Sequence, residues 1–216
     1  LLYNHNQPWV THASIQNGAA LEDFGRAGIY RRAYRKPVVF DEVGYEGDIP
    51  QGWGNRSAET VVNYFWHGTI AGTYVGHGET YQHPDDILWW SKGGVLHGES
   101  PTRIDFLREI LEQGPQLEPG NRSMDPHMAS KPGEYYLIYF GEEERESWLF
   151  KLPKNGLEVG DQFQAEIIDA WDMTITPVES KFEIESMGRR SCVSKENRSI
   201  LLPGKPYIAL RLRKVT

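Results

Sequence analysis

The pattern of predicted elements changes in the middle of this chain, close to Gly114. Before that point, short apolar runs alternate with helical segments, which is typical of parallel strands joined by helical crossovers. After it, short apolar runs follow one another with turn residues between them, which is typical of antiparallel sheets. The sequence therefore predicts an α/β part followed by an all-β part.

Three short strands and three helices are expected before Gly114. The strands are runs of apolar or β-forming residues at 8–13, 38–40 and 72–75. The helices are expected over residues 21–34, after the N-cap Ser57 and after the N-cap Ser100. Pro101 suits the first position of the last helix, and Gly114-Pro115 ends it.

The second part begins after a segment rich in Pro, Gly, Asn and Ser, which we interpret as a linker. The expected organisation is an α/β domain over residues 1–114, a linker over 115–130 and an antiparallel β-sandwich over 131–216. The expected strands are the short apolar runs at 135–140, 147–152, 163–171, 182–184 and 207–212.

Composition excludes several classes of protein. No apolar run approaches the roughly 18 residues that span a membrane. Lys and Arg total 23 against 30 Asp and Glu, and a net charge of −7 disfavours nucleic acid as a partner. The single Cys192 cannot form a disulfide within the chain, so it does not discriminate between the bacterial cytoplasm and secretion.

Glu42 is the candidate catalytic residue because it directly follows the run Val38-Val39-Phe40. The carboxyl ends of parallel strands are where α/β enzymes place reactive groups, and a carboxylate there can act as a nucleophile or a base. Glu42 can equally be a helix cap or an ion-pair partner of Arg56. Asp41 competes with it, because alternation sends the two side chains to opposite faces. Glu46 lies further into the loop and ranks below both.

Polar and aromatic residues in the other loops are candidates for binding a hydroxylated ligand. His77 and Glu79 belong to a tract dense in His, Glu and Tyr that follows the third strand. With His83 they match no tight zinc spacing, so we expect neither a metal ion nor a cofactor. Aromatic rings can stack on sugar rings, and the candidates among them are Tyr45, Trp53, Tyr74, Tyr81, Trp89 and Trp90. His12 and Ser14 line either a pocket or a buried polar contact, and each aromatic alone can be ordinary core packing.

Three segments resemble one family, at residues 9–16 (WVTHASIQ), 37–47 (PVVFDEVGYEG) and 93–101 (GGVLHGESP). They are similar to bacterial glycoside hydrolases with an apiosidase-like (β/α)₈ catalytic domain, and residues 168–175 (IDAWDMTI) resemble the β-sandwich that follows the barrel there. The resemblance implies that the three strands are the sixth, seventh and eighth of the barrel and that Glu42 is the nucleophile. The acid/base carboxylate of such enzymes follows the fourth strand, which this chain does not contain. A complete barrel needs roughly 250 residues, so the barrel here must be partial.

The sequence thus predicts the C-terminal fragment of a retaining glycosidase that cleaves O-glycosidic bonds of a plant or bacterial polysaccharide or oligosaccharide and is inactive alone. The residues expected to bind substrate are His12, Ser14, Tyr45, Tyr74, His77, Glu79 and Trp90. A partial barrel exposes strand edges, so the expected partners are a second copy or the missing part of the barrel. The alternative is a non-catalytic carbohydrate-binding or structural module.

Overall fold

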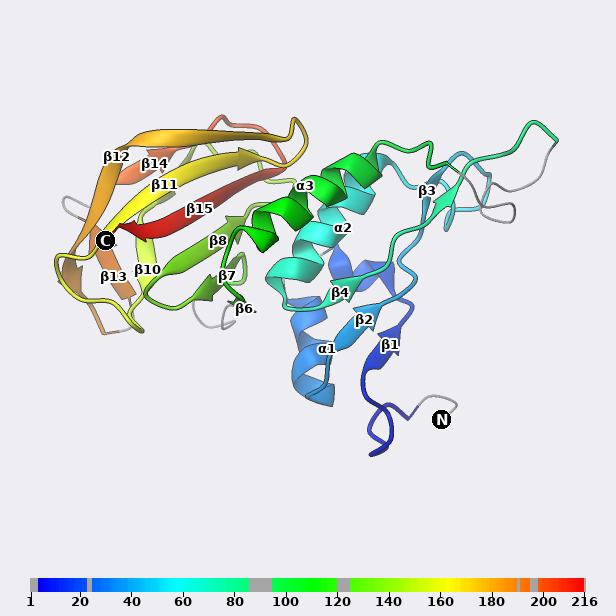
Figure 1. Ribbon diagram of the computed structural model, residues 1–216, viewed down its shortest axis with the longest axis horizontal. Helices are drawn as coiled ribbons and strands as arrows, with labels where there is room; N and C mark the ends of the chain where they lie inside the picture. Colours follow the sequence, from blue (N-terminus) through cyan, green and yellow to red (C-terminus); the bar gives the residue numbers. More distant parts are fainter. Residues whose placement is uncertain are drawn as a thin grey trace. The chain divides into compact units, whose positions relative to one another are not determined.

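The computed structural model describes residues 4–22, 25–85, 95–119, 125–189, 191–194 and 198–215 (Figure 1). The chain divides into two compact units, Leu1–Arg108 and Glu109–Thr216. The division falls within helix α3 (Ser100–Glu112), slightly before the boundary at residue 114 that the sequence suggested. Each unit is described by itself.

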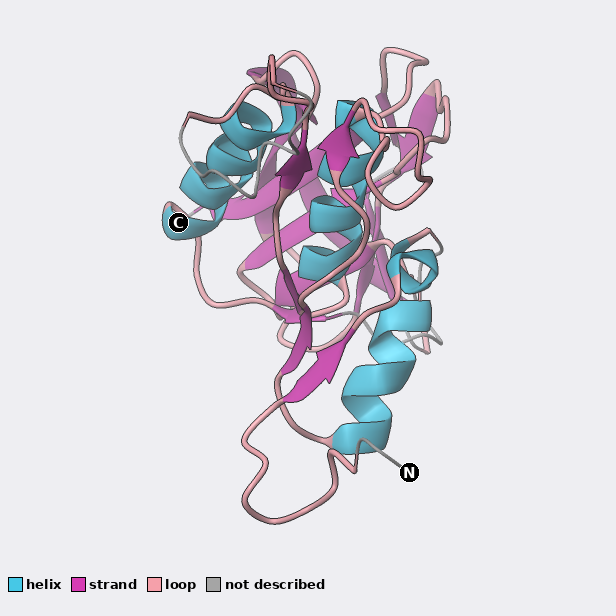
Figure 2. Cartoon of the chain, turned by 90° about the vertical axis from the view of Figure 1, so that its right-hand side faces the viewer, coloured by secondary structure: helices cyan, strands magenta, loops and turns pink. Residues whose placement is uncertain are grey.

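The first unit contains the expected parallel strands. β1 (Ala13–Ile15), β2 (Val38–Phe40) and β4 (Tyr74–Val75) form a three-stranded sheet in the order β1-β2-β4, and both pairings are parallel (Figure 1). Figure 2 distinguishes the helices from the strands by colour. Helix α1 (Arg26–Tyr34) lies between β1 and β2 in the sequence, and α2 (Ala58–Ile70) between β2 and β4. A second, two-stranded parallel sheet joins β3 (Glu46–Gly47) to β5 (Glu79–Thr80).

Only one face of the three-stranded sheet is buried by the described residues. Ala13, Val38 and Phe40 are fully buried and pack in one cluster with Leu21 and with Tyr64 of α2. On the other face, Ser14 and Tyr74 are exposed. A continuous apolar run such as Val38–Phe40 is typical of strands buried on both faces, but no described segment covers the second face here.

The boundaries of β1 and α1 differ from the expected ones for local reasons. Residues 4–10 form turns rather than a strand, with the amide of Gln7 bonded to the carbonyl of Asn4, and β1 begins only at Ala13. Gly18–Leu21 forms a 3₁₀ helix. Gly25 adopts a positive φ of 99°, which an α-helix does not accommodate, so α1 begins at Arg26 instead of near residue 21.

The N-terminal caps of the other two helices are partly as predicted. Ser57 caps α2, because its hydroxyl accepts the amide of Thr60 at 3.3 Å. Ser100, the predicted cap of α3, is instead the first residue of that helix. Helices α1, α2 and α3 are 9, 13 and 13 residues long, and in the described part of the chain none has the length and hydropathy of a membrane span.

The second unit is built on one large antiparallel sheet that curls around its own core (Figure 1). Its eight strands are, in sheet order, β10 (Lys151–Pro153), β13 (Ser191–Ser194), β12 (Thr174–Met187), β11 (Gln162–Asp169), β15 (Ile208–Val215), β8 (Tyr135–Tyr139), β7 (Met128–Lys131) and β6 (Glu118–Pro119). A separate two-stranded sheet pairs β9 (Ser147–Leu149) with β14 (Ser199–Leu201).

This architecture corrects two expectations for the second part. The sequence predicted a sandwich of two sheets, whereas the structure has one curled eight-stranded sheet and a small two-stranded one. The segment expected as a linker over 115–130 carries β6 and the start of β7. Both errors arise because short strands in a turn-rich sequence are recognisable only once their pairing partners are known.

Aromatic side chains fill the interior of the second unit. Phe150 is fully buried and stacks on Phe182 with ring centroids 5.1 Å apart, and its ring also lies 6.2 Å from that of Phe163. Strands β7 to β15 contribute side chains to this cluster, which makes it a core of its own.

We predict that residues 109–216 fold without the first unit, because they contain this separate core. Expressed alone, the segment should unfold in one cooperative thermal transition. Phe150→Ala in that segment should lower the free energy of unfolding by about 3–5 kcal/mol in urea titrations, because truncation leaves a cavity among the rings.

Leu201→Ala is the matched control. Leu201 is 77% exposed, so its truncation should change the free energy of unfolding by less than about 0.5 kcal/mol. A non-cooperative transition of the isolated segment would mean that its core depends on the first unit.

Candidate functional site

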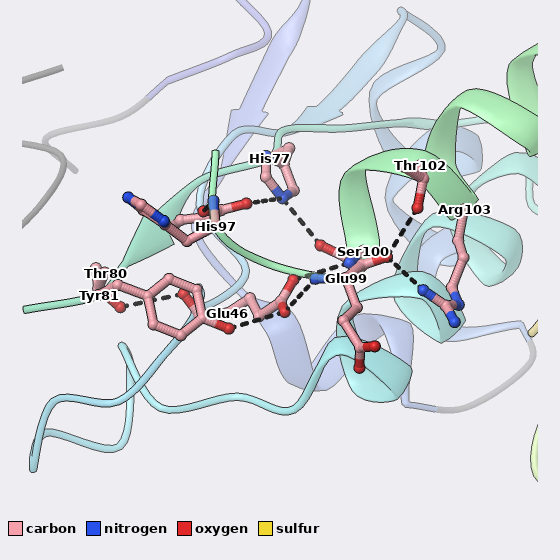
Figure 3. Close-up of polar contacts among 10 residues, drawn as sticks. Glu46, His77, Thr80, Tyr81, His97, Glu99, Ser100, Thr102 and Arg103 are labelled. Atoms are coloured by element: carbon pink, nitrogen blue, oxygen red, sulfur yellow. Dashed lines mark hydrogen bonds and ion pairs between the residues drawn. The ribbon is translucent and has the colours of Figure 1, made fainter. Parts of the chain in front are cut away.

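The carboxylate of Glu46 is buried and accepts several hydrogen bonds in the loops of the first unit. It is only 2% exposed and accepts three hydrogen bonds: from the Tyr81 hydroxyl at 2.9 Å, the Glu99 amide at 2.8 Å and the Ser100 amide at 3.0 Å (Figure 3). The two amides are those of Ser100, the first residue of α3, and of Glu99 directly before it, so Glu46 caps that helix from a distant segment. Burial raises the pKa of Glu46, but the hydrogen bonds outweigh burial and hold the pKa below its ordinary value.

Glu79 lies beside Glu46, because β3 and β5 pair in register at these two residues. Glu79 is 3% exposed, and its Oε2 accepts the amide of His97 at 2.7 Å. Its Oε1 is buried, accepts no hydrogen bond from the described residues and lies 4.0 Å from Nε2 of His77. The same nitrogen is 3.0 Å from the hydroxyl of Ser100. Burial lowers the pKa of His77, and the charges of Glu79 and Glu46 oppose that shift.

The cluster of Glu46, His77 and Glu79 has the composition of a metal site. One potential ligand atom from each residue lies within 4.8 Å of the other two. The oxygens of Glu46, however, already accept three N–H or O–H donors, which a cation would have to displace. His83, the other histidine considered from the sequence, is not in the cluster and lies 3.4 Å from Asp85. We interpret the cluster as a hydrogen-bonded network.

A pocket of about 530 Å³ opens beside this network. Its lining residues come from the loops after β2 and β4 and are Glu42, Tyr45, Trp53, His77, Gly78 and Glu79. It therefore combines two carboxylates, an imidazole and two aromatic rings. Such a mixture of apolar faces and polar groups suits a ligand that has hydroxyls on an apolar ring.

Tyr45 is positioned by its neighbours in this pocket. Its ring packs edge-on against the ring of Trp53 at a centroid distance of 6.0 Å. A Cβ atom at Gly78 would lie 2.7 Å from the Tyr45 ring, so only glycine permits this approach. Burial raises the pKa of Tyr45, as do the charge of Glu42 and a hydrogen bond to it. The phenol of Tyr45 is therefore a donor toward Glu42.

Asp41 takes a different direction from Glu42. Its carboxylate accepts the hydroxyl of Ser14 at 2.5 Å, and both residues are exposed on the open side of the parallel sheet. Glu42 is half-buried and lines the pocket instead. Ser14 thus contacts the competing carboxylate and is not among the residues that line the pocket with Glu42.

Two more of the predicted residues, His12 and Tyr74, are placed apart from this pocket. His12 is exposed, with Nδ1 3.0 Å from the hydroxyl of Thr11. Tyr74 is 64% exposed on the sheet. Neither lines the pocket. Trp90 and its neighbour Trp89 lie outside the described residues. Four of the seven candidates for substrate binding are therefore not placed in the pocket with Glu42.

Two residues have larger roles than the sequence suggested. Trp53, noted only as one of many aromatics, lines the pocket and is 42% exposed. Glu46, ranked below Glu42 and Asp41, organises the adjacent network. No local pattern distinguishes Glu46, because its donors lie 35 to 54 residues away along the chain.

Two solved structures that resemble this chain are described as glycoside hydrolases. The chain is 36% identical over 99% of its length to a candidate glycoside hydrolase from Bacteroides vulgatus, with a TM-score of 0.92 against that crystal structure. A second structure, described as a glycoside hydrolase, matches 98% of the chain with 13% identity and a TM-score of 0.62. The chain spans 43% and 54% of the lengths of these two proteins. It therefore has a glycoside hydrolase-like fold.

Two further comparisons concern sequence. Residues 124–213 match a protein family described as a domain of unknown function, DUF5605. No curated protein matches the chain.

We predict that Glu46→Gln destabilises the first unit. The amide keeps the shape of the side chain but loses the charge that three donors surround, so the free energy of unfolding should fall by about 1.5–3 kcal/mol at neutral pH. Because the folded pKa lies below its unfolded value, this contribution is fully present above about pH 5 and is lost as the pH falls through the folded pKa.

Urea unfolding of wild type and variant from about pH 7 to about pH 3 measures both effects. The difference between the two proteins should shrink toward acid pH. Glu99→Gln is the control, since Glu99 contributes its backbone amide to Glu46 while its own side chain is exposed. Equal stability of wild type and Glu46→Gln at neutral pH would show that the network is not structural.

Proposed function

We propose that this chain is the C-terminal part of a retaining glycoside hydrolase in which Glu42 is the nucleophile. The observation that carries the proposal is the position of Glu42, which follows β2 and lines an aromatic pocket in a chain with a glycoside hydrolase-like fold. Asp41, its competitor, is bonded to Ser14 on the open face of the sheet and does not line this pocket. The location of Glu42 matches the general rule that reactive groups lie at the carboxyl ends of parallel strands.

In the complete protein, β1, β2 and β4 would be the sixth to eighth strands of a (β/α)₈ barrel. Their parallel pairing in sequence order, with α1 and α2 as crossovers, supports this. So does the exposed face that carries Ser14 and Tyr74, since the inner face of a barrel is covered only when the remaining strands are present. The partner of this face would be the missing part of the barrel or a second copy of the chain.

The proposed reaction has two steps. A carboxylate oxygen of Glu42 attacks the anomeric carbon, the glycosidic C–O bond breaks, and an acid residue protonates the leaving oxygen. Water then attacks the anomeric carbon of the glycosyl-enzyme, gives its proton to the same residue and frees Glu42. We place that acid/base residue after the fourth barrel strand, outside the 216 residues. Tyr45 would orient the attacking carboxylate through its hydroxyl.

The substrate would be a plant or bacterial polysaccharide or oligosaccharide with an O-glycosidic bond. The exposed ring of Trp53 offers an apolar surface for a sugar face, and His77 offers a polar group for hydroxyls. Glu79 would act on the sugar through His77, because its own oxygens are buried.

Glu42→Gln in the complete enzyme should reduce kcat by about 10³-fold or more, because the covalent route is lost. Folding should be unaffected, since Glu42 is only half-buried. Asp41→Asn is the matched control and should retain activity within about tenfold. The measurement is the hydrolysis of an activated aryl glycoside, with thermal unfolding of each variant as a check of folding.

Azide rescue identifies the nucleophile independently. In Glu42→Ala, azide should attack the anomeric carbon from the vacated side and yield a glycosyl azide of inverted configuration. A Glu42→Gln enzyme that keeps more than a few per cent of wild-type kcat would refute the assignment. Rapid hydrolysis by the isolated 216-residue chain, abolished by Glu42→Ala, would instead refute the need for an upstream acid and would make Glu46, Glu79 and Glu99 the candidates.

A further inference from the structure

A second pocket of about 410 Å³ lies in the second unit. Three separate segments line it: the residues before β7, the region of β9 and β10, and the start of β13. β10 and β7 lie near opposite ends of the eight-stranded sheet, so the curl brings both ends of the sheet to this pocket. The mouth of a curled or closed sheet is a common location for ligand sites, and the volume falls within their usual range of about 300–1,000 Å³.

The floor of this pocket is apolar. Met128, Trp148 and Leu152 line it, and they are 2%, 6% and 1% exposed because they also belong to the core of the unit. Leu149, which is 44% exposed, adds apolar surface at the mouth. A ligand in the pocket would therefore meet carbon atoms on one side.

The rim is polar and contains both donors and acceptors. The side chain of Lys151 is exposed and makes no hydrogen bond or ion pair with the described residues. Arg145 uses its Nε for Glu143 at 2.6 Å, and its guanidinium lies 4.9 Å over the ring of Phe140, so its two terminal nitrogens remain available among the described residues. Asp125 accepts the amide of His127 through Oδ1 and keeps Oδ2 as an acceptor.

The charges of the rim favour a neutral ligand. Glu143 balances Arg145, and the remaining Lys151 and Asp125 carry opposite charges. The hydroxyls of Ser147 and Ser191 add groups that can donate or accept. A neutral molecule that has adjacent hydroxyls on one side and an apolar C–H face on the other fits this lining. Sugar rings have this character, whereas a fully apolar ligand would leave the rim groups without partners.

We infer that this pocket is a saccharide-binding site for a neutral sugar residue, separate from the pocket that contains Glu42. Lys151 and Arg145 donate to hydroxyls, Asp125 accepts from one, and the Leu149 side chain packs against the ring. The site is non-catalytic and does not depend on the role of Glu42.

The test is a titration of the isotopically labelled 216-residue chain with four separate probes, followed by amide NMR spectra. The probes are tetrasaccharides of xylose, glucose, galactose and arabinose, each raised to about 20 mM because isolated sugar sites bind weakly. At least one should shift the amide signals of Ser147, Leu149, Lys151 and Ser191. Lys151→Ala should weaken that binding about tenfold, the expected cost of one charge-assisted hydrogen bond.

Lys181→Ala is the matched control, since Lys181 is exposed on β12 of the same unit and does not line the pocket. It should leave the affinity unchanged, as should Glu42→Gln. Failure of all four probes to shift these signals would overturn the inference, as would equal affinity of wild type and Lys151→Ala. Shifts confined to residues around Glu42 would also overturn it while leaving the proposed function standing.

Discussion

A buried carboxylate, that of Glu46, holds together the loops that carry the candidate site. It lies at the start of β3, bonds to Tyr81 after β5 and accepts the first amides of α3. The side chain of Glu46 is only 2% exposed, so its charge has lost its contact with water. The three hydrogen-bond donors replace that hydration, and without them the buried charge would destabilise the fold. The arrangement leaves no room for a Cβ at Gly98, which approaches the carboxylate closely. The loops are thus held by these polar contacts as well as by the buried apolar side chains of Val43 and Ile49.

This constraint determines where the pocket can form. Glu46 and Glu79 are paired residues in the sheet formed by β3 and β5. α3 is the next helix after β5 in the sequence. Nε2 of His77 lies near the carboxylate of Glu79 and the hydroxyl of Ser100. His77 also lines the pocket that contains Glu42. The same loops therefore place Glu42 in the pocket and hold two buried carboxylates next to His77. Burial lowers the pKa of His77, and the charges of Glu79 and Glu46 oppose that shift.

The two units use different physical means to create a pocket. In the first unit, polar loops at the ends of parallel strands surround Glu42, Tyr45 and Trp53. In the second, a single sheet curls around aromatic side chains such as Phe150 and leaves a polar rim where its ends approach. A pocket built from loops suits chemistry because several segments can contribute reactive groups. A pocket at the end of a packed core suits binding, because the floor of such a pocket is rigid and apolar.

The amino-acid sequence by itself determined the α/β to β transition, the parallel strand at Val38–Phe40, the cap at Ser57 and the strand-end position of Glu42, because these follow from local periodicity and residue type. Only the tertiary structure decided that Asp41 meets Ser14, that Glu46 caps α3 and that β6 and β7 join one curled sheet. These contacts join residues far apart in the chain. Their partners are chosen by burial and register, which no local pattern encodes.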